Sequence, residues 1–439
     1  MRPHLPIGLA TGLIAATLLS NAPAQAAAET CQGRPATIVG SYLQREVVGT
    51  EGADVVVTNG AIEVDTRGGD DLVCVTESEG RYPDLSLATG AGDDVVDASG
   101  SRGSVGVELG AGSDHYTGSA GGGDWVVAGG EGRDTEPDTI HTGAGTLVDS
   151  VVSGSPGVPN GDVVVVEAGG TVYWSGPMTE GARLDATAGP GSTLVPDLGT
   201  GHAVVDATAG TLERDGFVTL RWTGFDGFAF SGTRAPSAFR FDGSDRDETV
   251  YVSFPTRVHD RQRFYLGGGD DTLLSPDGAG GSRSRYVGGD GDDRVDLWAG
   301  RRLDLDLASG TMTMRQDGTI ARSRFTGFET SLLGAKDLRV RGTKGADELR
   351  FYACRATVRG RAGKDDIASA RTADDADLLG CDARTSRIRI YGDAGRDTLR
   401  GSRGRDLLVG GPGRDTINGN ANRDTCSGEK LRSCEVRLR

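Results

Sequence analysis

The sequence predicts an all-β chain that winds as a right-handed parallel β-roll or β-helix, a solenoid with irregular insertions. Short glycine-rich turns that end in aspartate recur along most of the chain, which holds 71 glycines. Glycine is too frequent, and apolar residues at i, i+3, i+4 spacing are too rare, to favour helices. Long aliphatic runs are scarce, but each coil of a stacked solenoid buries only a few side chains against its neighbours. These observations favour repetitive β-structure over a large globular core.

The most regular repeat lies near the C-terminus, where four nine-residue units follow one another without a break. The units are Gly392–Arg400, Gly401–Val409, Gly410–Asn418 and Gly419–Ser427. The sixth residue of every unit is an aspartate: Asp397, Asp406, Asp415 and Asp424. Positions one and four of the first three units are glycines: Gly392, Gly395, Gly401, Gly404, Gly410 and Gly413. Such strict spacing predicts one structural unit for each nine residues.

These units resemble the calcium-binding nonapeptide G-G-x-G-x-D-x-U-x, with U apolar, of repeats-in-toxin (RTX, hemolysin-type) proteins. The resemblance implies a turn over the first six residues, a short strand over the last three, and two units per coil. It therefore places Asp397 over Asp415 and Asp406 over Asp424. It also implies Ca²⁺ as the cofactor, since a hard cation needs converging oxygens from carboxylates and turn carbonyls. Without a cation, the same column is a stack of like charges.

Degenerate copies of the turn appear well before the C-terminal block. Their aspartates are further candidate calcium ligands: Asp54, Asp71, Asp94, Asp114, Asp134, Asp271, Asp293, Asp347 and Asp365. The first five are 17, 23, 20 and 20 residues apart, close to one motif per solenoid coil. The alternative is a turn that keeps its shape without an ion, because aspartate is common in turns. Adjacent acids such as Asp70 and Asp71 point to opposite faces of an extended chain and make poor catalytic dyads.

Charge and targeting signals narrow the function. The formal net charge of −16 fits a cation binder and argues against nucleic-acid binding. Residues 1–28 resemble a cleavable signal peptide, so we expect an extracellular protein with no transmembrane segment after cleavage. The sequence contains no H-E-x-x-H, G-x-S-x-G or G-x-x-x-x-G-K-[ST] motif. We expect a secreted calcium-binding protein that is not an enzyme. A polysaccharide-active β-helix enzyme and a cell-surface adhesin or matrix protein remain the alternatives.

A longer repeat suggests how the chain is divided. Val205–Gly227 resembles Leu305–Thr330, with Gly210 and Gly310 placed 100 residues apart. We therefore expect a degenerate solenoid over 29–200, two copies of a β module over 201–300 and 301–391, the nonapeptide roll over 392–427, and a terminal cap over 428–439.

Cysteines and arginines complete the prediction. Six cysteines in an exported chain suggest disulfides, and fifteen connectivities are possible. Sequence proximity favours Cys31–Cys74, Cys354–Cys381 and Cys426–Cys434, the last as a lock on the terminal coil. The fifth position of each nonapeptide is an arginine: Arg396, Arg405, Arg414 and Arg423. These arginines either discourage strand aggregation or form a strip for anionic cell-wall or matrix polysaccharide.

Overall fold

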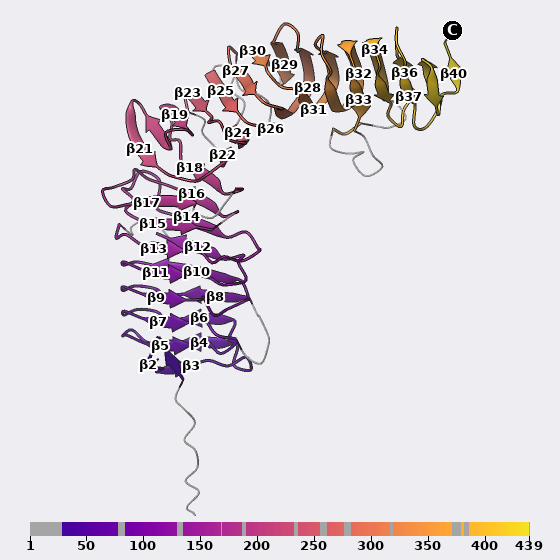
Figure 1. Cartoon of the computed structure of the whole chain (residues 1–439). Coiled ribbons are helices and arrows are strands. Elements are labelled where there is room, and N and C mark those ends of the chain that lie inside the picture. Colours follow the sequence, from indigo (N-terminus) through magenta and orange to yellow (C-terminus); the bar gives the residue numbers. More distant parts are fainter. Residues whose placement is uncertain are drawn as a thin grey trace, which may run out of the picture.

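The computed structural model describes residues 29–77, 84–129, 135–167, 169–186, 190–231, 236–254, 261–275, 282–316, 319–370, 379–381 and 386–438. All regular secondary structure in these ranges is β-strand, and they contain no helix that could cross a membrane. The strands stack as rungs in two runs, which meet at an angle near β18 (Thr193–Pro196) and β22 (Gly227–Ser231) (Figure 1). The fold is the all-β parallel solenoid that the sequence predicts.

The first run consists of two parallel sheets, to which successive coils contribute alternate strands. After a short antiparallel pair, β1 (Thr30–Cys31) and β2 (Arg34–Pro35), one sheet contains β3 (Ile38–Val39), β5 (Val55–Val57), β7 (Leu72–Cys74), β9 (Val95–Asp97), β11 (His115–Thr117), β13 (Thr139–His141), β15 (Val163–Val166) and β17 (Arg183–Ala186). The other contains β4 (Glu46–Val48), β6 (Glu63–Asp65), β8 (Leu85–Ala88), β10 (Val105–Gly110), β12 (Trp125–Ala128), β14 (Ser150–Ser153), β16 (Thr171–Trp174) and β18. Only the second sheet continues as named strands into the second run, where β18 pairs with β22.

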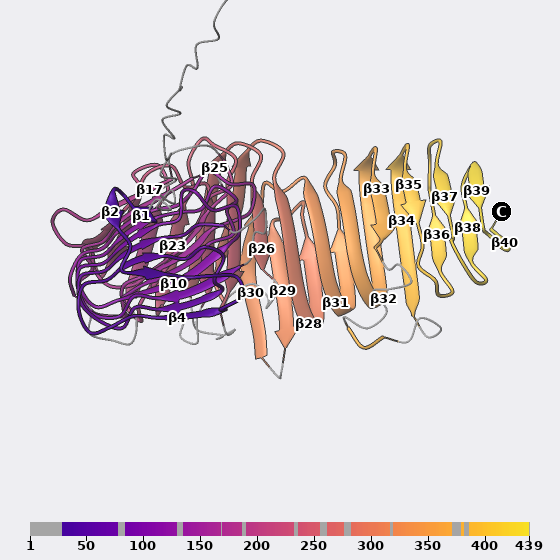
Figure 2. The ribbon, with the colours of Figure 1, turned by 90° about the horizontal axis from the view of Figure 1, so that it is seen from below.

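The second run also has two sheet faces. One face continues from β22 through β24 (Thr249–Ser253), β26 (Thr272–Ser275), the first half of β28 (Arg294–Asp306), β31 (Thr330–Arg341), β32 (Glu348–Gly363), β33 (Asp366–Ser369), β35 (Thr398–Arg400), β37 (Thr416–Asn418) and β39 (Lys430–Arg432). The other face contains β19 (His202–Asp206), β23 (Ala238–Asp242), β25 (Arg261–Gly268), β27 (Arg285–Asp290), β30 (Thr319–Thr326), the second halves of β28, β31 and β32, then β34 (Arg387–Gly395), β36 (Leu407–Val409), β38 (Thr425–Ser427) and β40 (Val436–Arg437). Figure 2 shows these strands side by side, with turns at both edges.

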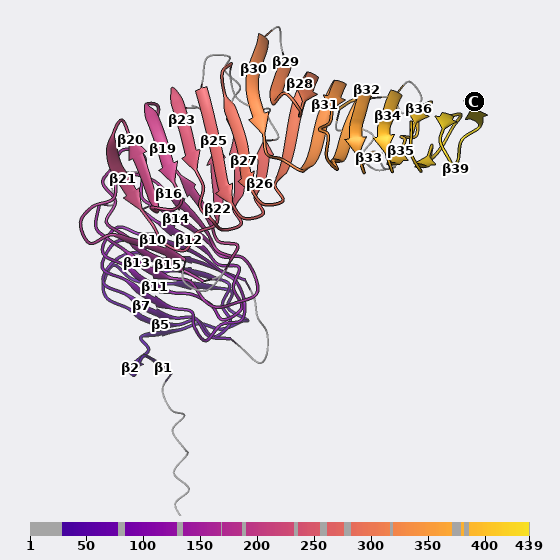
Figure 3. The same cartoon turned by 45° about the horizontal axis from the view of Figure 1, so that its top comes forward.

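The longer sequence repeat corresponds to a repeated antiparallel excursion. In the first copy, β19 pairs with β20 (Thr211–Arg214), which pairs with β21 (Phe217–Arg221). In the second, β28 pairs with β29 (Thr311–Gln316), which pairs with β30. Both first turns use a glycine in left-handed geometry, Gly210 with φ 61° and Gly310 with φ 62°. The strands β28 to β30 extend beyond their neighbours (Figures 2 and 3).

The buried side chains change in kind along the solenoid. Coils of the first run bury valines and other aliphatic residues, for example Val73 and Val96. At the bend, aromatic rings take over and contact one another, such as Phe228 with Phe241 at 5.2 Å between ring centroids. The nonapeptide block buries one apolar residue per unit, Leu399, Leu408, Ile417 and Cys426, each fully enclosed. The C-terminal coils therefore have the smallest apolar core.

Disulfide bonds join Cys31 to Cys74, Cys354 to Cys381 and Cys426 to Cys434. These are the pairs that sequence proximity favours. The C-terminal tail lies over the last nonapeptide coil, to which Cys426–Cys434 joins it. Its strands β39 and β40 pair in parallel with β37 and β38 and add one further coil to the solenoid.

Candidate calcium-binding turns

Stacked aspartates form a ladder along the nonapeptide block. The backbone N–H of Asp397 donates to Asp415 Oδ1 over 2.9 Å, and that of Asp406 donates to Asp424 Oδ1 over 2.9 Å. Asp397 is 1% exposed and Asp424 is fully buried. The stacking is the one that the RTX resemblance implies. Each carboxylate therefore uses one oxygen to hold the preceding coil in register.

The same ladder runs through both ends of the molecule. Before the nonapeptide block, Asp347 N–H donates to Asp365 Oδ1 and Asp365 N–H to Asp397 Oδ1, each over 3.0 Å. In the first run, every N–H donates to the next Oδ1 in the order Asp54, Asp71, Asp94, Asp114 and Asp138. Each of these residues lies one position before a strand. The same aspartate-to-backbone hydrogen bond therefore recurs from coil to coil in both runs.

In turns that begin with glycine, this glycine leaves room for the carboxylate that follows five residues later. A Cβ at Gly392 would lie 2.3 Å from Asp397 Oδ2 and 2.7 Å from the carbonyl oxygen of Gly410 in the next coil. At Gly360 the corresponding distances are 2.1 Å to Asp365 Oδ2 and 2.7 Å to Gly392 O. Side-chain and carbonyl oxygens thus converge on a space that any larger residue would fill. Such mixed oxygen donors suit Ca²⁺.

The turns occur in two backbone forms, which we call open and closed. In an open turn, the residues at positions two and four are both left-handed, as at Asp393 (φ 67°) and Gly395 (φ 150°) before Asp397. The turn before Asp424 is open too, with Asn420 at φ 72° and Asn422 at φ 77°. In a closed turn, position two is serine or threonine and neither position is among the described left-handed residues. The closed turns precede Asp54, Asp347 and Asp406.

The two forms differ in whether Oδ2 of the ladder aspartate accepts a hydrogen bond. In the closed turn of Asp406, the backbone N–H and the hydroxyl of Ser402 both donate to Oδ2, the hydroxyl over 3.0 Å. Thr50 donates in the same way to Asp54 Oδ2, and Thr343 to Asp347. In the described open turns, a buried Oδ2 lacks any hydrogen-bond donor at Asp71, Asp94, Asp271, Asp293, Asp365, Asp397, Asp415 and Asp424. Serine or threonine therefore supplies the donor in closed turns, and open turns leave an oxygen directed into the protein without one.

Burial shifts the titration of the open-turn carboxylates. Desolvation raises the pKa of Asp94, Asp293 and Asp365 to about 6, with repulsion from neighbouring acids adding to the shift. The pKa of Asp424 rises to about 7 and that of Asp271 to about 8, again chiefly through burial. Burial also raises the pKa of Asp397 and Asp415. A cation beside these oxygens would favour their ionised form.

Sequence analysis missed several members of the ladder. Asp134 lies outside the described residues, and the carboxylate that accepts Asp114 N–H is Asp138. Glutamates end the C-terminal columns, since Asp415 N–H donates to Glu429 and Asp424 N–H to Glu435. Other missed members are Asp124, Asp149, Asp162, Glu248 and Glu329. The pattern of an acid, any residue and then a buried apolar residue finds most of them, for example Asp138-Thr139-Ile140.

The adjacent acids divide between an inner and an outer position. Asp71 is 2% exposed, whereas its neighbour Asp70 faces solvent and accepts Asp93 N–H over 3.0 Å. Asp93 in turn accepts Ser113 N–H over 2.9 Å. The pairs serve two separate ladders and do not converge on one point, as expected for neighbours on an extended chain.

The described residues contain no group of three or more His, Cys, Asp or Glu side chains placed to hold a metal ion. A site here would therefore combine one or two carboxylates with backbone carbonyls. The residues fit such a site, because an unsatisfied Asp397 Oδ2 and the carbonyl of Gly410 already converge beside Gly392. Calcium accepts six to eight oxygens in flexible geometry, including backbone carbonyls.

Comparison with protein families decides the nature of the block. Residues 391–426 match the family model of the RTX calcium-binding nonapeptide repeat, in four copies. These residues are RTX repeats. RTX nonapeptides are calcium-binding motifs, so Ca²⁺ is the ion of this block and the chain is a calcium-binding repeat protein. The match covers a short part of the chain, and no curated protein matches it in a sequence comparison.

Proposed function

We propose that the protein is exported and that Ca²⁺, bound between its open turns, drives the solenoid to fold outside the cell. One observation carries the proposal: left-handed residues at positions two and four coincide with a buried carboxylate oxygen that lacks a donor, as at Asp397 and Asp415. A buried, unsatisfied carboxylate oxygen is costly, and a cation bound beside it removes that cost. Calcium binding then contributes directly to folding free energy.

The proposal distinguishes calcium-binding turns from structural ones. Open turns that begin with glycine, including those of Asp293 and Asp365, take the ion, although they lie outside the RTX match. Closed turns keep their shape through serine or threonine donors and take none. This assigns Asp54, Asp347 and Asp406 a structural role, so Asp406 acts by holding its own turn and the next coil.

Export and the absence of catalysis are parts of the same proposal. RTX nonapeptides are typical of secreted proteins, and the predicted signal peptide, residues 1–28, lies outside the described residues. Extracellular calcium would then be met only after export. The acids of the turns are engaged in ladders along the solenoid, which favours a binding protein over a polysaccharide-active enzyme.

Calorimetric titration of the mature chain with CaCl₂, after treatment with chelator, tests the proposal. We expect calcium to bind and to raise the melting temperature, and equimolar Mg²⁺ to do neither, since it demands stricter octahedral geometry. The same melting curve in excess calcium and in chelator, with no heat of binding, would contradict it. Secretion is tested separately by following the full-length chain and a variant that lacks residues 1–28 in the culture medium.

A further inference from the structure

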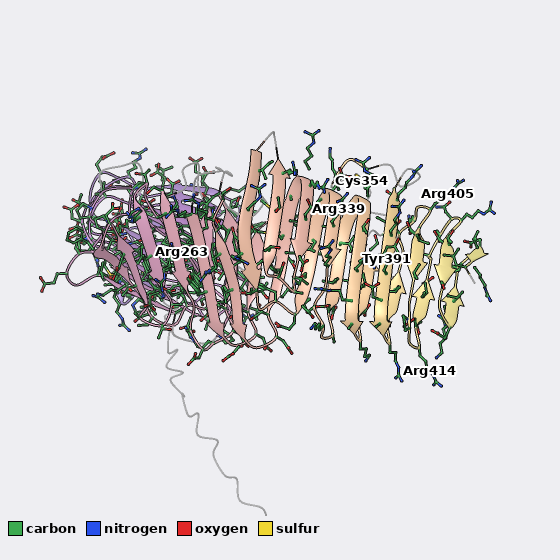
Figure 4. The ribbon with its side chains drawn as sticks, turned by 90° about the horizontal axis from the view of Figure 1, so that it is seen from above. Arg263, Arg339, Cys354, Tyr391, Arg405 and Arg414 are labelled. Atoms are coloured by element: carbon green, nitrogen blue, oxygen red, sulfur yellow. A yellow bond between two sulfur atoms is a disulfide. The ribbon has the colours of Figure 1, made fainter. Side chains whose placement is uncertain are left out.

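A row of arginines crosses one face of the second run. Hydrogen-bonded strand pairing places Arg240 opposite Arg263, Arg263 opposite Arg285, and Arg285 opposite Arg324. All four side chains are exposed. Figure 4 shows Arg263 on this face, with Arg339 and Tyr391 farther along it. The strands are about 4.8 Å apart, so four like charges repeat over about 14 Å.

A second row runs beside the first. Arg261 and Arg283 lie two residues before Arg263 and Arg285, and Arg283 N–H donates to the carbonyl of Arg322 over 2.7 Å. A surface hollow of about 410 Å³ lies where the rows end, lined by Arg283, Arg285, Arg322 and Arg324 together with Thr311 and Thr313. The arginines thus surround a recess.

Ion pairing accounts for Arg240, which pairs with Asp242 over 2.8 Å, but not for the arginines that follow it, and edge protection does not account for them either. Among the described residues, Arg263, Arg285 and Arg322 have no acidic partner, whereas Arg302 and Arg355 farther along the face pair with Asp304 and Asp337. The strands β25 and β27 lie inside the sheet, so these charges do not protect an edge. Like charges directly opposite one another destabilise a sheet. A binding partner of opposite charge would offset that repulsion.

We propose that this arginine face binds a linear anionic polysaccharide, one that carries carboxylate or sulfate groups along an extended chain. Guanidinium groups pair with such oxyanions through two parallel hydrogen bonds. The charged strip is narrow, and the rest of a chain with net charge −16 would repel a broad anionic surface such as a bilayer or a duplex. Single-stranded nucleic acid is bound by stacking its bases on open aromatic rings. On this face arginines cover the tyrosine rings: the guanidinium of Arg359 lies 4.3 Å from the centre of the Tyr391 ring, and that of Arg240 lies 5.4 Å from the centre of the Tyr265 ring.

The test measures binding of the calcium-saturated full chain to immobilised hyaluronate, which carries carboxylates, and to dextran sulfate, with neutral dextran as the blank. One variant carries Arg263→Ser, Arg285→Ser and Arg322→Ser. A charge-matched control carries Arg396→Ser, Arg405→Ser and Arg414→Ser in the nonapeptide turns, where Figure 4 shows Arg405 and Arg414 at opposite edges. Thermal melts check that both variants fold.

We expect the first variant to bind at least one polysaccharide about tenfold more weakly, because it loses three charge-assisted contacts. The control should keep wild-type affinity. The polysaccharide that responds identifies the anion. Equal losses in both variants, absence of binding by the wild type, or tighter binding to single-stranded DNA or phosphatidylserine vesicles would each overturn the proposal. The proposal does not depend on which turns bind calcium.

Discussion

The nonapeptide block and the first run build the same carboxylate ladder on very different cores. In the first run, a coil of about twenty residues buries several aliphatic side chains from both sheets around each ladder aspartate, such as Val73 and Leu87 with Asp71. In the nonapeptide block, each coil buries two apolar residues, for example Leu399 and Leu408, for two ladder aspartates. The ratio of apolar burial to buried charge is therefore much lower at the C-terminal end. Where the core is smallest, we expect the ion to contribute most to stability.

Removing calcium should separate these two regions, and we expect this to be the largest effect. A ligand at a hundred times its Kd stabilises a site by about 2.7 kcal/mol, and the C-terminal block holds several open turns. Hydrogen exchange measured by mass spectrometry in chelator should show loss of amide protection over β35 to β40 and retained protection over β8 to β12. Uniform loss, or no loss in either region, would contradict a difference in calcium dependence.

Neutralising one aspartate in each kind of turn sharpens the comparison within the block. Asp415→Asn removes a charge from an open turn and should weaken calcium binding at that site by about 1.4 kcal/mol or more, a factor of ten. Asp406→Asn should leave the calcium stoichiometry unchanged. It should instead lower stability by about 1–3 kcal/mol even in chelator, because asparagine keeps only one of the two oxygens that accept from Ser402 and replaces the other with a donor.

Titration calorimetry and chelator melts of both variants distinguish these outcomes. Equal losses of calcium binding would show that the open and closed backbone forms do not separate ion-binding from structural turns. Wild-type stability of Asp406→Asn in chelator would show that the hydrogen bonds of Ser402 do not hold the closed turn.

The ladder was predictable where the glycine–aspartate motif is regular. It was harder to predict where an acid takes the same place in a turn that lacks the motif. The stacking of Asp397 on Asp415 was implied by the resemblance of the nine-residue units to RTX repeats, and the structure shows it. Asp138 was not predicted because Gly129–Asp134 matches the glycine-rich motif more closely. Asp138-Thr139-Ile140 lacks those glycines but holds the required acid and buried apolar residue. Glu429 and Glu435 were missed because a longer side chain reaches the same N–H from a turn without the motif.

The difference between open and closed turns was visible in the sequence only after the structure gave it a meaning. Ser402, Thr50 and Thr343 all occupy position two, where the family pattern has glycine. Their hydroxyl groups take the role of a donor, and their backbone is not left-handed. The arginine rows depend on the pairing of β27 with β30, which brings Arg285 opposite Arg324 across the intervening strands β28 and β29. No local motif in the sequence predicts that register.

The pH dependence should reverse between the two ion conditions. The folded-state pKa values of Asp365 and Asp424, about 6 and about 7, lie above the unfolded value near 3.8. These two carboxylates therefore contribute most to the stability of the ion-free protein below pH 4, and their contribution is lost as pH rises through 6 to 7, because the unfolded state binds fewer protons. Calcium affinity should rise over the same range, since the ion requires ionised carboxylates. Melts from pH 4.5 to 8 in chelator and in calcium check both signs. A rise in ion-free stability with pH would show that these carboxylates are not buried without a counter-charge.

Converting a closed turn to an open one is the smallest change and tests the comparison most directly. Ser402→Gly removes the hydroxyl donor and lets position two become left-handed, as Gly411 already is with φ 104°. In chelator we expect a loss of about 1 kcal/mol, the net value of a hydrogen bond. In calcium we expect one additional bound ion, because the turn of Asp406 now matches the open turns that flank it. Ser402→Ala is the matched control, since it removes the same hydroxyl group but disfavours left-handed geometry. It should lose stability without gaining an ion, and an unchanged stoichiometry in Ser402→Gly would show that backbone form at position two does not govern calcium binding.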